Sequence, residues 1–283
     1  MALTVTTNTT SLSVQKNLNR ASDALSTSMQ RLSSGLKINS AKDDAAGLQI
    51  ASRMTSQIRG MVQATQNAND GISIAQTAEG ALQASTDILQ RMRELAIKAR
   101  NGTNSSADQT ATNAEFGQMS DELTRIAAST NLNGKNLMDG TAGTMQLQVG
   151  ANVGSANRID LVLSTSFDAV SLSVGSGTVV LTGATSATLS ANIDNAITAI
   201  DAALATINST RANLGASQNR LTSTIANLQN ITENTTAAQG RVQDTDFAAE
   251  TANLTKQQTL QQASTAVLAQ ANQLPSAVLK LLQ

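Results

Sequence analysis

The stretch IDNAITAIDAALATINSTRANLGASQNRLTSTIANL (193–228) decides the fold. Its apolar side chains recur in steps of three and four residues, at Ile193, Ile197, Ile200, Leu204, Ile207, Leu214, Leu221, Ile225 and Leu228. This spacing lines one face of an α-helix and is typical of a coiled-coil seam. Arg211 and Gln218 interrupt the series, and polar side chains at a seam cost stability but can fix the register of a helix pair. The stretch is therefore predicted to be one long helix packed along its length.

Three further segments carry the same period. A ladder in the first half consists of Met61, Ala68, Ala75, Leu82, Leu89 and Ala96. The N-terminal segment has Val14, Leu18, Ala21, Leu25, Leu32 and, as a weak member, Ser28. The C-terminal segment has Leu260, Val267, Leu274 and Leu281. Each series predicts a helix with one narrow apolar face.

The helical pattern stops in the middle of the chain. Asn101-Gly102 is a plausible helix end, and Ser106 with Gln109 resembles the capping box that begins a new helix. Farther on, MQLQVG (145–150) and RIDLVL (158–163) read as the two strands of a β-hairpin with a longer turn. Gly, Ser and Thr are dense after these strands, so no regular element is assigned there.

The fold is therefore predicted to be mainly α. It would consist of long antiparallel coiled-coil helices, formed by the paired N- and C-terminal segments, with a small β-hairpin region in the middle of the chain. Residues 1–44 and 241–283 would form a terminal coiled-coil domain, and 45–164 with 189–240 a helical rod domain carrying the hairpin. Residues 165–188 would be a short variable outer segment. The polar stretches 31–46 and 240–246 read as joints between the two helical layers.

The composition argues against most chemistry. The chain has no His, Cys, Trp or Tyr, and its aromatic content is 1%. A Ser-His-Asp or Cys-His nucleophile and a conventional zinc site are thereby excluded. The net charge of −1 offers no general basic surface for nucleic acid. No apolar run approaches the ~20 residues of a membrane span, and MALTVTTNTTSLSVQ (1–15) lacks the features of a secretory signal peptide. No cofactor, nucleic acid or membrane insertion is expected.

Weaker signals have structural explanations. Ser34-Gly-Leu-Lys37 fits the S-x-x-K of some serine hydrolases but lacks its companion motifs. The Asp43-Asp44 pair and Asp244-x-Asp246 have no closing Glu of a calcium loop. These carboxylates are instead expected to form ion pairs with basic neighbours, of which the sequence offers Lys37, Lys42 and Arg241.

Long segments of the chain resemble bacterial flagellin. They include SVQKNLNRASDALSTSMQRLSSGLKINSAKDDAAGLQIASRM (13–54), ILQRMRELAIKARNGT (88–103), NLNGKNLMDG (131–140), MQLQVGAN (145–152) and TKQQTLQQASTAVLAQANQLPSAVLKLL (255–282). The resemblance covers about 1–164 and 189–283. It implies a structural subunit that self-assembles into the flagellar filament for swimming motility, and no enzyme. Such subunits are secreted unfolded through the flagellar type III apparatus, without a cleavable signal peptide, and polymerise at the filament tip outside the cell.

The resemblance also implies partners and surfaces. The expected partners are other copies of the chain, the filament cap protein, hook-associated junction proteins, an export chaperone on the C-terminal helix and Toll-like receptor 5 of hosts. The inner-tube assembly seam would be Leu18, Leu25, Leu32, Leu260, Val267, Leu274 and Leu281. Axial contacts and the innate receptor would share the surface of Gln90, Arg91, Glu94, Leu95 and Glu115.

Three alternatives remain at this point. A hook–filament junction protein shares the terminal helices but should not polymerise indefinitely. An autonomous helical bundle would bury its own terminal helices without neighbours. An enzyme using Ser34 and Lys37 has almost no support in the sequence.

Overall fold

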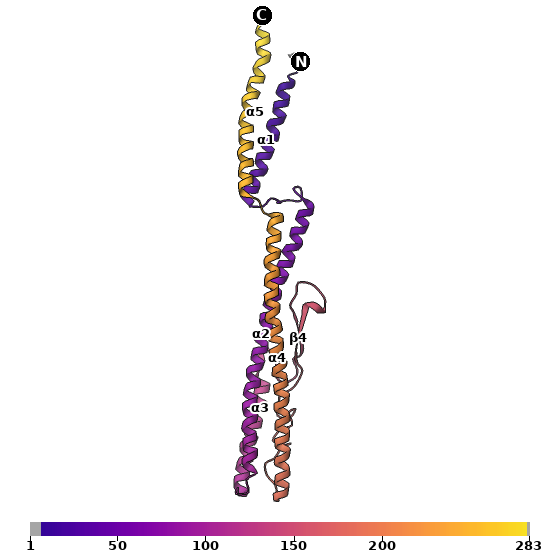
Figure 1. Ribbon diagram of the computed structural model, residues 1–283, viewed down its shortest axis with the longest axis vertical. Coiled ribbons are helices and arrows are strands. Elements are labelled where there is room, and N and C mark those ends of the chain that lie inside the picture. The colour runs from indigo at the N-terminus through magenta and orange to yellow at the C-terminus, as the bar shows by residue number, and fades with distance from the viewer. Residues whose placement is uncertain (1–6, 282–283) are drawn as a thin grey trace. The chain divides into compact units, whose positions relative to one another are not determined.

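The computed structural model describes residues 7–281, and the side chains of residues 7–273. Within these residues the α-helices are α1 (Thr9–Ser34), α2 (Ala45–Ala99), α3 (Ser106–Ser129), α4 (Ser186–Gln243) and α5 (Phe247–Leu281) (Figure 1). The short strands β1 (Asn131–Leu132) and β2 (Lys135–Asn136) pair with each other, as do β3 (Gly143–Gln148) and β4 (Arg158–Leu163). A 3-10 turn, η1 (Ser155–Asn157), precedes β4. The predicted mainly α fold with a central β-hairpin is confirmed.

The chain divides into two compact units. Unit 1 contains Met1–Gln57 and Glu233–Gln283, and unit 2 contains Ile58–Thr232. The dividing points lie inside α2 and α4, so these two helices contribute to both units.

The core of unit 2 is built on the two predicted seams. The ladder of α2, from Met61 to Ala96, is buried at every one of its positions. The members of the α4 series that lie seven residues apart are buried as well: Ile193, Ile200, Ile207, Leu214, Leu221 and Leu228. The polar residue Gln218, which interrupts this series, forms a hydrogen bond between the two helices: its side-chain amide donates to Glu79 Oε2 of α2 over 3.0 Å. These helices therefore pack along the faces that their periodicity predicts.

The hairpin packs closely against α2. β3 and β4 are antiparallel, with Leu147 opposite Ile159 and Met145 opposite Leu161. A Cβ atom at Gly71 would collide with a Leu147 methyl group, so the missing side chain of Gly71 lets the strand approach the helix. Ile159 and Leu161 are buried at this contact. Gly71 weakens α2 locally, but its missing side chain makes room for the hairpin to pack against the helix.

Residues 165–188 add to the same core without forming a strand. Their buried side chains are Phe167, Ala169, Leu172, Val174, Val179 and Leu181. Helix side chains hold their backbone in place: the Leu181 N–H donates to Asn113 Oδ1 (2.7 Å), and the Asn192 amide donates to the Thr182 carbonyl (2.8 Å). The segment predicted to be a variable outer piece therefore lies partly inside unit 2. Its place in an assembly stays a prediction.

The start of α3 differs by one residue from the expected capping box. The box is made by Ser105 and Asp108 rather than by Ser106 and Gln109. The Ser105 hydroxyl accepts a hydrogen bond from the Asp108 N–H, and Asp108 Oδ2 accepts from the Ser105 N–H (2.9 Å). A carboxylate is a stronger acceptor for a free helix N–H than an amide oxygen, which accounts for the shift.

We expect acid to weaken this cap. Hydrogen bonds from the Ser105 hydroxyl and then from its N–H lower the pKa of Asp108. Because the folded pKa lies below the unfolded value of about 3.9, the stabilisation is present above that value and is lost as the pH falls through the folded pKa. The Asp108→Asn variant should therefore lose less unfolding free energy than the parent when urea unfolding is compared at pH 5 and pH 3. Equal losses in both proteins would contradict the assignment.

Candidate functional site

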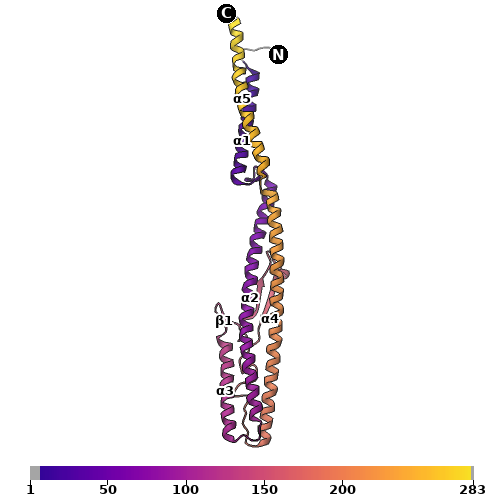
Figure 2. The ribbon, with the colours of Figure 1, turned by 60° about the vertical axis from the view of Figure 1, so that its left-hand side comes forward.

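The first and last helices pair within unit 1. α1 and α5 lie side by side and run in opposite directions (Figures 1 and 2). At one end the Asn8 amide donates to the Ala271 carbonyl, and the Ser11 hydroxyl donates to Asn272 Oδ1, both over 2.9 Å. The predicted stripe of α1 is its most shielded side: Ala21 and Ser28 are buried, and the three leucines Leu18, Leu25 and Leu32 are half-buried.

The face of α5 that lies against α1 is not the face that carries its regularly spaced apolar residues. Its shielded residues are Glu250, Leu254, Gln257, Gln261, Ser264, Leu268 and Ala271. Two residues of the predicted assembly seam, Leu260 and Val267, are 44% and 51% exposed in the single chain. The side chains of Leu274 and Leu281 lie outside the described part of the structure. The pairing face was missed because it is largely polar, whereas the apolar stripe of α5 has no partner within the described residues of the chain.

Residues 35–44 separate α1 from α2, and residues 244–246 separate α4 from α5. Backbone hydrogen bonds join these two segments, which together are here called the joint. Gly35 ends α1 with a φ of 71°, a conformation that favours glycine. The Thr245 N–H donates to the Gly35 carbonyl (2.9 Å), and the Lys37 N–H donates to the Gln243 carbonyl (2.7 Å). Leu36 and Asp244 form an isolated antiparallel bridge. The two polar segments, rich in small residues, are thus held together by hydrogen bonds between their backbones.

Three carboxylates of the joint, those of Asp43, Asp44 and Asp246, accept hydrogen bonds from backbone N–H groups instead of pairing with lysines. Asp44 accepts from the Gly47 N–H at the start of α2, and Asp246 accepts from the Ala248 N–H at the start of α5. Hydrogen bonds from the N–H and hydroxyl of Ser40 lower the pKa of Asp43, and the nearby charge of Arg31 lowers it further. The expected ion pairs with Lys37, Lys42 or Arg241 do not occur among the described side chains. Free helix N–H groups compete better for these short side chains than distant lysines do.

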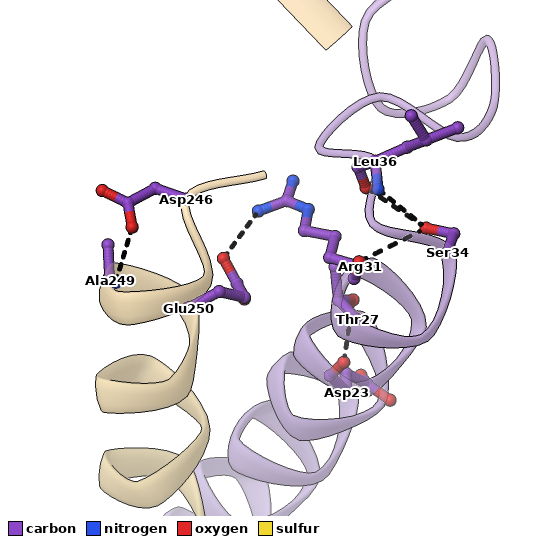
Figure 3. A network of polar contacts seen from close by, with 8 residues as sticks. All are labelled: Asp23, Thr27, Arg31, Ser34, Leu36, Asp246, Ala249 and Glu250. Atoms are coloured by element: carbon purple, nitrogen blue, oxygen red, sulfur yellow. Dashed lines mark hydrogen bonds and ion pairs between the residues drawn. The ribbon is translucent and has the colours of Figure 1, made fainter. Parts of the chain in front are cut away.

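The ion pair found at this end of the helices is Arg31 with Glu250, at 3.9 Å (Figure 3). Arg31 belongs to the last turn of α1 and Glu250 to the first turn of α5. The positive charge therefore lies at the negative end of the α1 dipole, and the negative charge lies at the positive end of the α5 dipole, which is favourable in both helices. Sequence reasoning missed this pair. The available signal was the placement of a basic and an acidic residue at the adjoining ends of two helices predicted to be paired.

The predicted axial and receptor surface lies on unit 2. Gln90, Arg91 and Glu94 are exposed on α2, and Glu115 is half-exposed on α3. The Arg91 guanidinium donates to Glu115 (2.8 Å) and to Glu94 (3.0 Å), and these hydrogen bonds, that to Glu115 first, raise the pKa of Arg91. Leu95 does not share this surface. It is 1% exposed because it follows Met92 on the buried stripe of α2, so its role is packing.

Ser34 and the acidic residues show no arrangement for chemistry. The Ser34 hydroxyl donates to the Arg31 carbonyl (3.4 Å) and accepts from the Leu36 N–H (3.2 Å), which is a helix-end cap. No group of three metal-ligating side chains is found among the described residues. In that same part of the chain, no helix is long and apolar enough to cross a membrane.

Comparisons with known proteins agree with this architecture. The family model for the bacterial flagellin N-terminal helical region matches residues 5–143, and that for the C-terminal helical region matches 197–282. Polar flagellin C of Vibrio parahaemolyticus is 38% identical over 384 aligned positions, and flagellin A of Vibrio anguillarum is 38% identical over 379, each alignment covering 100% of both chains. These alignments exceed the 283 residues of this chain, so the relatives carry residues without a counterpart here.

A solved structure has a similar fold. A putative flagellar hook-associated protein from Vibrio parahaemolyticus superposes with a TM-score of 0.59 over 71% of this chain and 100% of its own, at 14% identity. That similarity concerns the fold alone. The family matches and the full-length identity decide between the alternatives: the chain belongs to the bacterial flagellins, the structural, non-enzymatic subunits of the flagellar filament.

Proposed function

We propose that this chain polymerises through its terminal helices, with the stripe of α5 that carries Leu260 and Val267 packed against other copies. The observation that supports this most directly is the exposure of both side chains in the single chain. The α1–α5 pair buries little by itself: its buried residues in the described part are Ala21, Ser28, Glu250 and Ala271. Two helices with so small a common core gain much of their stability from neighbours.

The domain organisation proposed from the sequence follows the same logic. Residues 1–44 and 241–283 would form the inner tube, with Leu18, Leu25, Leu32, Leu274 and Leu281 in its seam beside Leu260 and Val267. Residues 45–164 and 189–240 would form the surrounding rod. Residues 165–188 would face outward in the filament, and the exposed Val170 on this segment is consistent with that placement.

Export and the other partners belong to the same proposal. The chain would leave the cell through the flagellar type III route without a cleavable signal peptide, with its C-terminal helix held by an export chaperone. It would then add at the tip under the cap protein, above hook-associated junction proteins. The exposed α5 stripe is the kind of apolar surface that a chaperone must cover before assembly.

Removal of both ends tests the polymerisation. The full chain, given a precipitant or filament seeds, should produce long uniform filaments in electron micrographs. A variant lacking 1–44 and 241–283 should stay monomeric and helical, because the main core lies in unit 2. A full chain that remained monomeric would refute the proposed function, and filaments from the shortened chain would refute the role of the ends.

The receptor surface gives a second test. We propose that Toll-like receptor 5 and axially stacked subunits use Gln90, Arg91, Glu94 and Glu115. Arg91→Ala should lower the potency of monomeric protein on receptor-bearing reporter cells by about tenfold or more, since truncating a central arginine of an interface commonly costs over 1 kcal/mol. Arg125→Ala, which removes another exposed arginine paired with a glutamate on its own helix, is the control. No response to the parent protein at any dose would exclude the receptor as a partner.

A further inference from the structure

We propose that Arg31 and Glu250 form a clasp that selects one register for the α1–α5 pair and so positions the exposed stripe of α5 for assembly. This inference rests on the proposed function, because it assigns positioning residues within the surface that polymerises.

Burial singles out Glu250. It is 9% exposed and is the only charged residue in the described part of the chain that is buried. A carboxylate removed from water is costly unless a cation compensates it. Here Arg31 NH1 lies 3.9 Å from Glu250 Oε2 (Figure 3). The buried carboxylate of Glu250 therefore depends on Arg31 being in place, whereas the Arg31 side chain keeps part of its contact with water.

The rest of the helix interface specifies register weakly. On α5 the shielded residues between Glu250 and Ala271 include Gln257, Gln261 and Ser264. On α1 the fully buried residues are the small Ala21 and Ser28. Both series repeat every seven residues, so a slip by seven residues would bring similar side chains together along most of the pair. Flat repeats of this kind need a polar or charged position to choose a register.

A slip would break the backbone hydrogen bonds of the joint, and it would also be costly at the clasp. With the pairing of Arg31 and Glu250, a shift of seven residues would place Ala24 or Ile38 opposite the buried carboxylate. Neither residue can neutralise it. The stripe of Leu260 and Val267 would move by about two helical turns along α1, and the α1–α5 pair would present it in a different position to other copies.

The joint reinforces the clasp. Arg31 also lowers the pKa of Asp43 through its charge, so its guanidinium acts on the joint as well as on α5. The buried Arg31 Nε and Thr245 Oγ1 have no hydrogen-bond partner among the described residues. The clasp is therefore fixed by charge and by the bridge of Leu36 and Asp244 rather than by a saturated hydrogen-bond network. A pair held in this way contributes specificity more than stability.

Disulfide trapping measures the register. The chain has no cysteine, so a designed pair reports without background. Ser11→Cys with Asn272→Cys marks the observed register, since the two native side chains are hydrogen-bonded. Ser11→Cys with Thr265→Cys marks the register slipped by seven residues. Both pairs are introduced into the full chain and oxidised before and after polymerisation, and intrachain products are separated from crosslinked dimers by size.

With Arg31 and Glu250 present, the first pair should close and the second should not. In Arg31→Leu/Glu250→Leu chains, the helices should still pair but the slipped product should rise about tenfold, because two apolar side chains replace the charges without choosing a register. Filaments of these chains should be fewer and irregular. The exposed ion pair of Arg93 and Asp201 in unit 2, replaced by leucines in the same way, is the matched control and should change neither product.

Two results overturn the clasp. One is that the Arg31→Leu/Glu250→Leu chain still yields only the product of the observed register. The other is that the first cysteine pair fails to close even in the parent background. The failure of the proposed function looks different, because the parent would then form no filaments while its cysteine pairs still report the register.

Discussion

We expect Val267→Asp to leave the monomer folded and to abolish filaments. In the single chain Val267 is 51% exposed, so a carboxylate there keeps most of its water and costs little. In the proposed tube the same group would be buried without a cation, at a cost on the order of several kcal/mol in every subunit. Seeded polymerisation followed by light scattering and electron microscopy should show no growth, while circular dichroism should match the parent.

Val170→Asp is the matched control for that experiment. Val170 is 72% exposed and belongs to the segment proposed to face outward, so filaments should form normally. If Val170→Asp stops polymerisation, the outward placement of residues 165–188 is wrong. If Val267→Asp chains make ordinary filaments, the assignment of the α5 stripe to the assembly seam fails.

The long helices of unit 2 could be predicted because their signal is local and strong. Ile200, Ile207 and Leu214 on α4 are large, apolar and evenly spaced, and the chain buries them by itself. The hairpin was predictable for a similar reason, since a period of two residues identifies its strands. In both cases the sequence pattern and the burial within one chain coincide.

The pairing face of α5 shows where that reasoning stops. An apolar stripe indicates that something covers it, and the resemblance assigned this one to the inner-tube assembly seam. Within the single chain, Gln257, Gln261 and Ser264 lie toward the shielded side, and Leu260 and Val267 are exposed. When a helix has two unequal partners, the apolar face can belong to the one outside the chain. Periodicity alone cannot distinguish these cases.

Contacts between residues that are distant in the sequence could not be predicted from the local pattern either. Arg31 and Glu250 meet only because the two ends of the chain return to each other, and the bonds of the joint join backbone atoms, which carry no sequence signal. The buried residues of 165–188 follow neither a helical nor a strand period. Their burial depends on packing against side chains of other elements in the same core, which a local pattern does not describe.

Phe167→Ala should be the most destabilising single truncation in that segment. Phe167 is 0% exposed, and its N–H donates to the Met138 carbonyl over 2.8 Å, so the backbone cannot easily shift to fill the space. Removing a fully buried phenylalanine side chain commonly costs about 3–5 kcal/mol of unfolding free energy. Urea unfolding followed by circular dichroism measures the loss directly, since the chain lacks Trp and Tyr for fluorescence.

Phe247→Ala is the control for Phe167→Ala, because it truncates the same residue type at an exposed position. Phe247 begins α5 and is 58% exposed, so its truncation should change the unfolding free energy by less than about 1 kcal/mol. A small effect at both positions would mean that residues 165–188 rest on the surface of unit 2 and add little to its stability. A large effect at Phe167 alone would make the segment part of the core on which the rod depends.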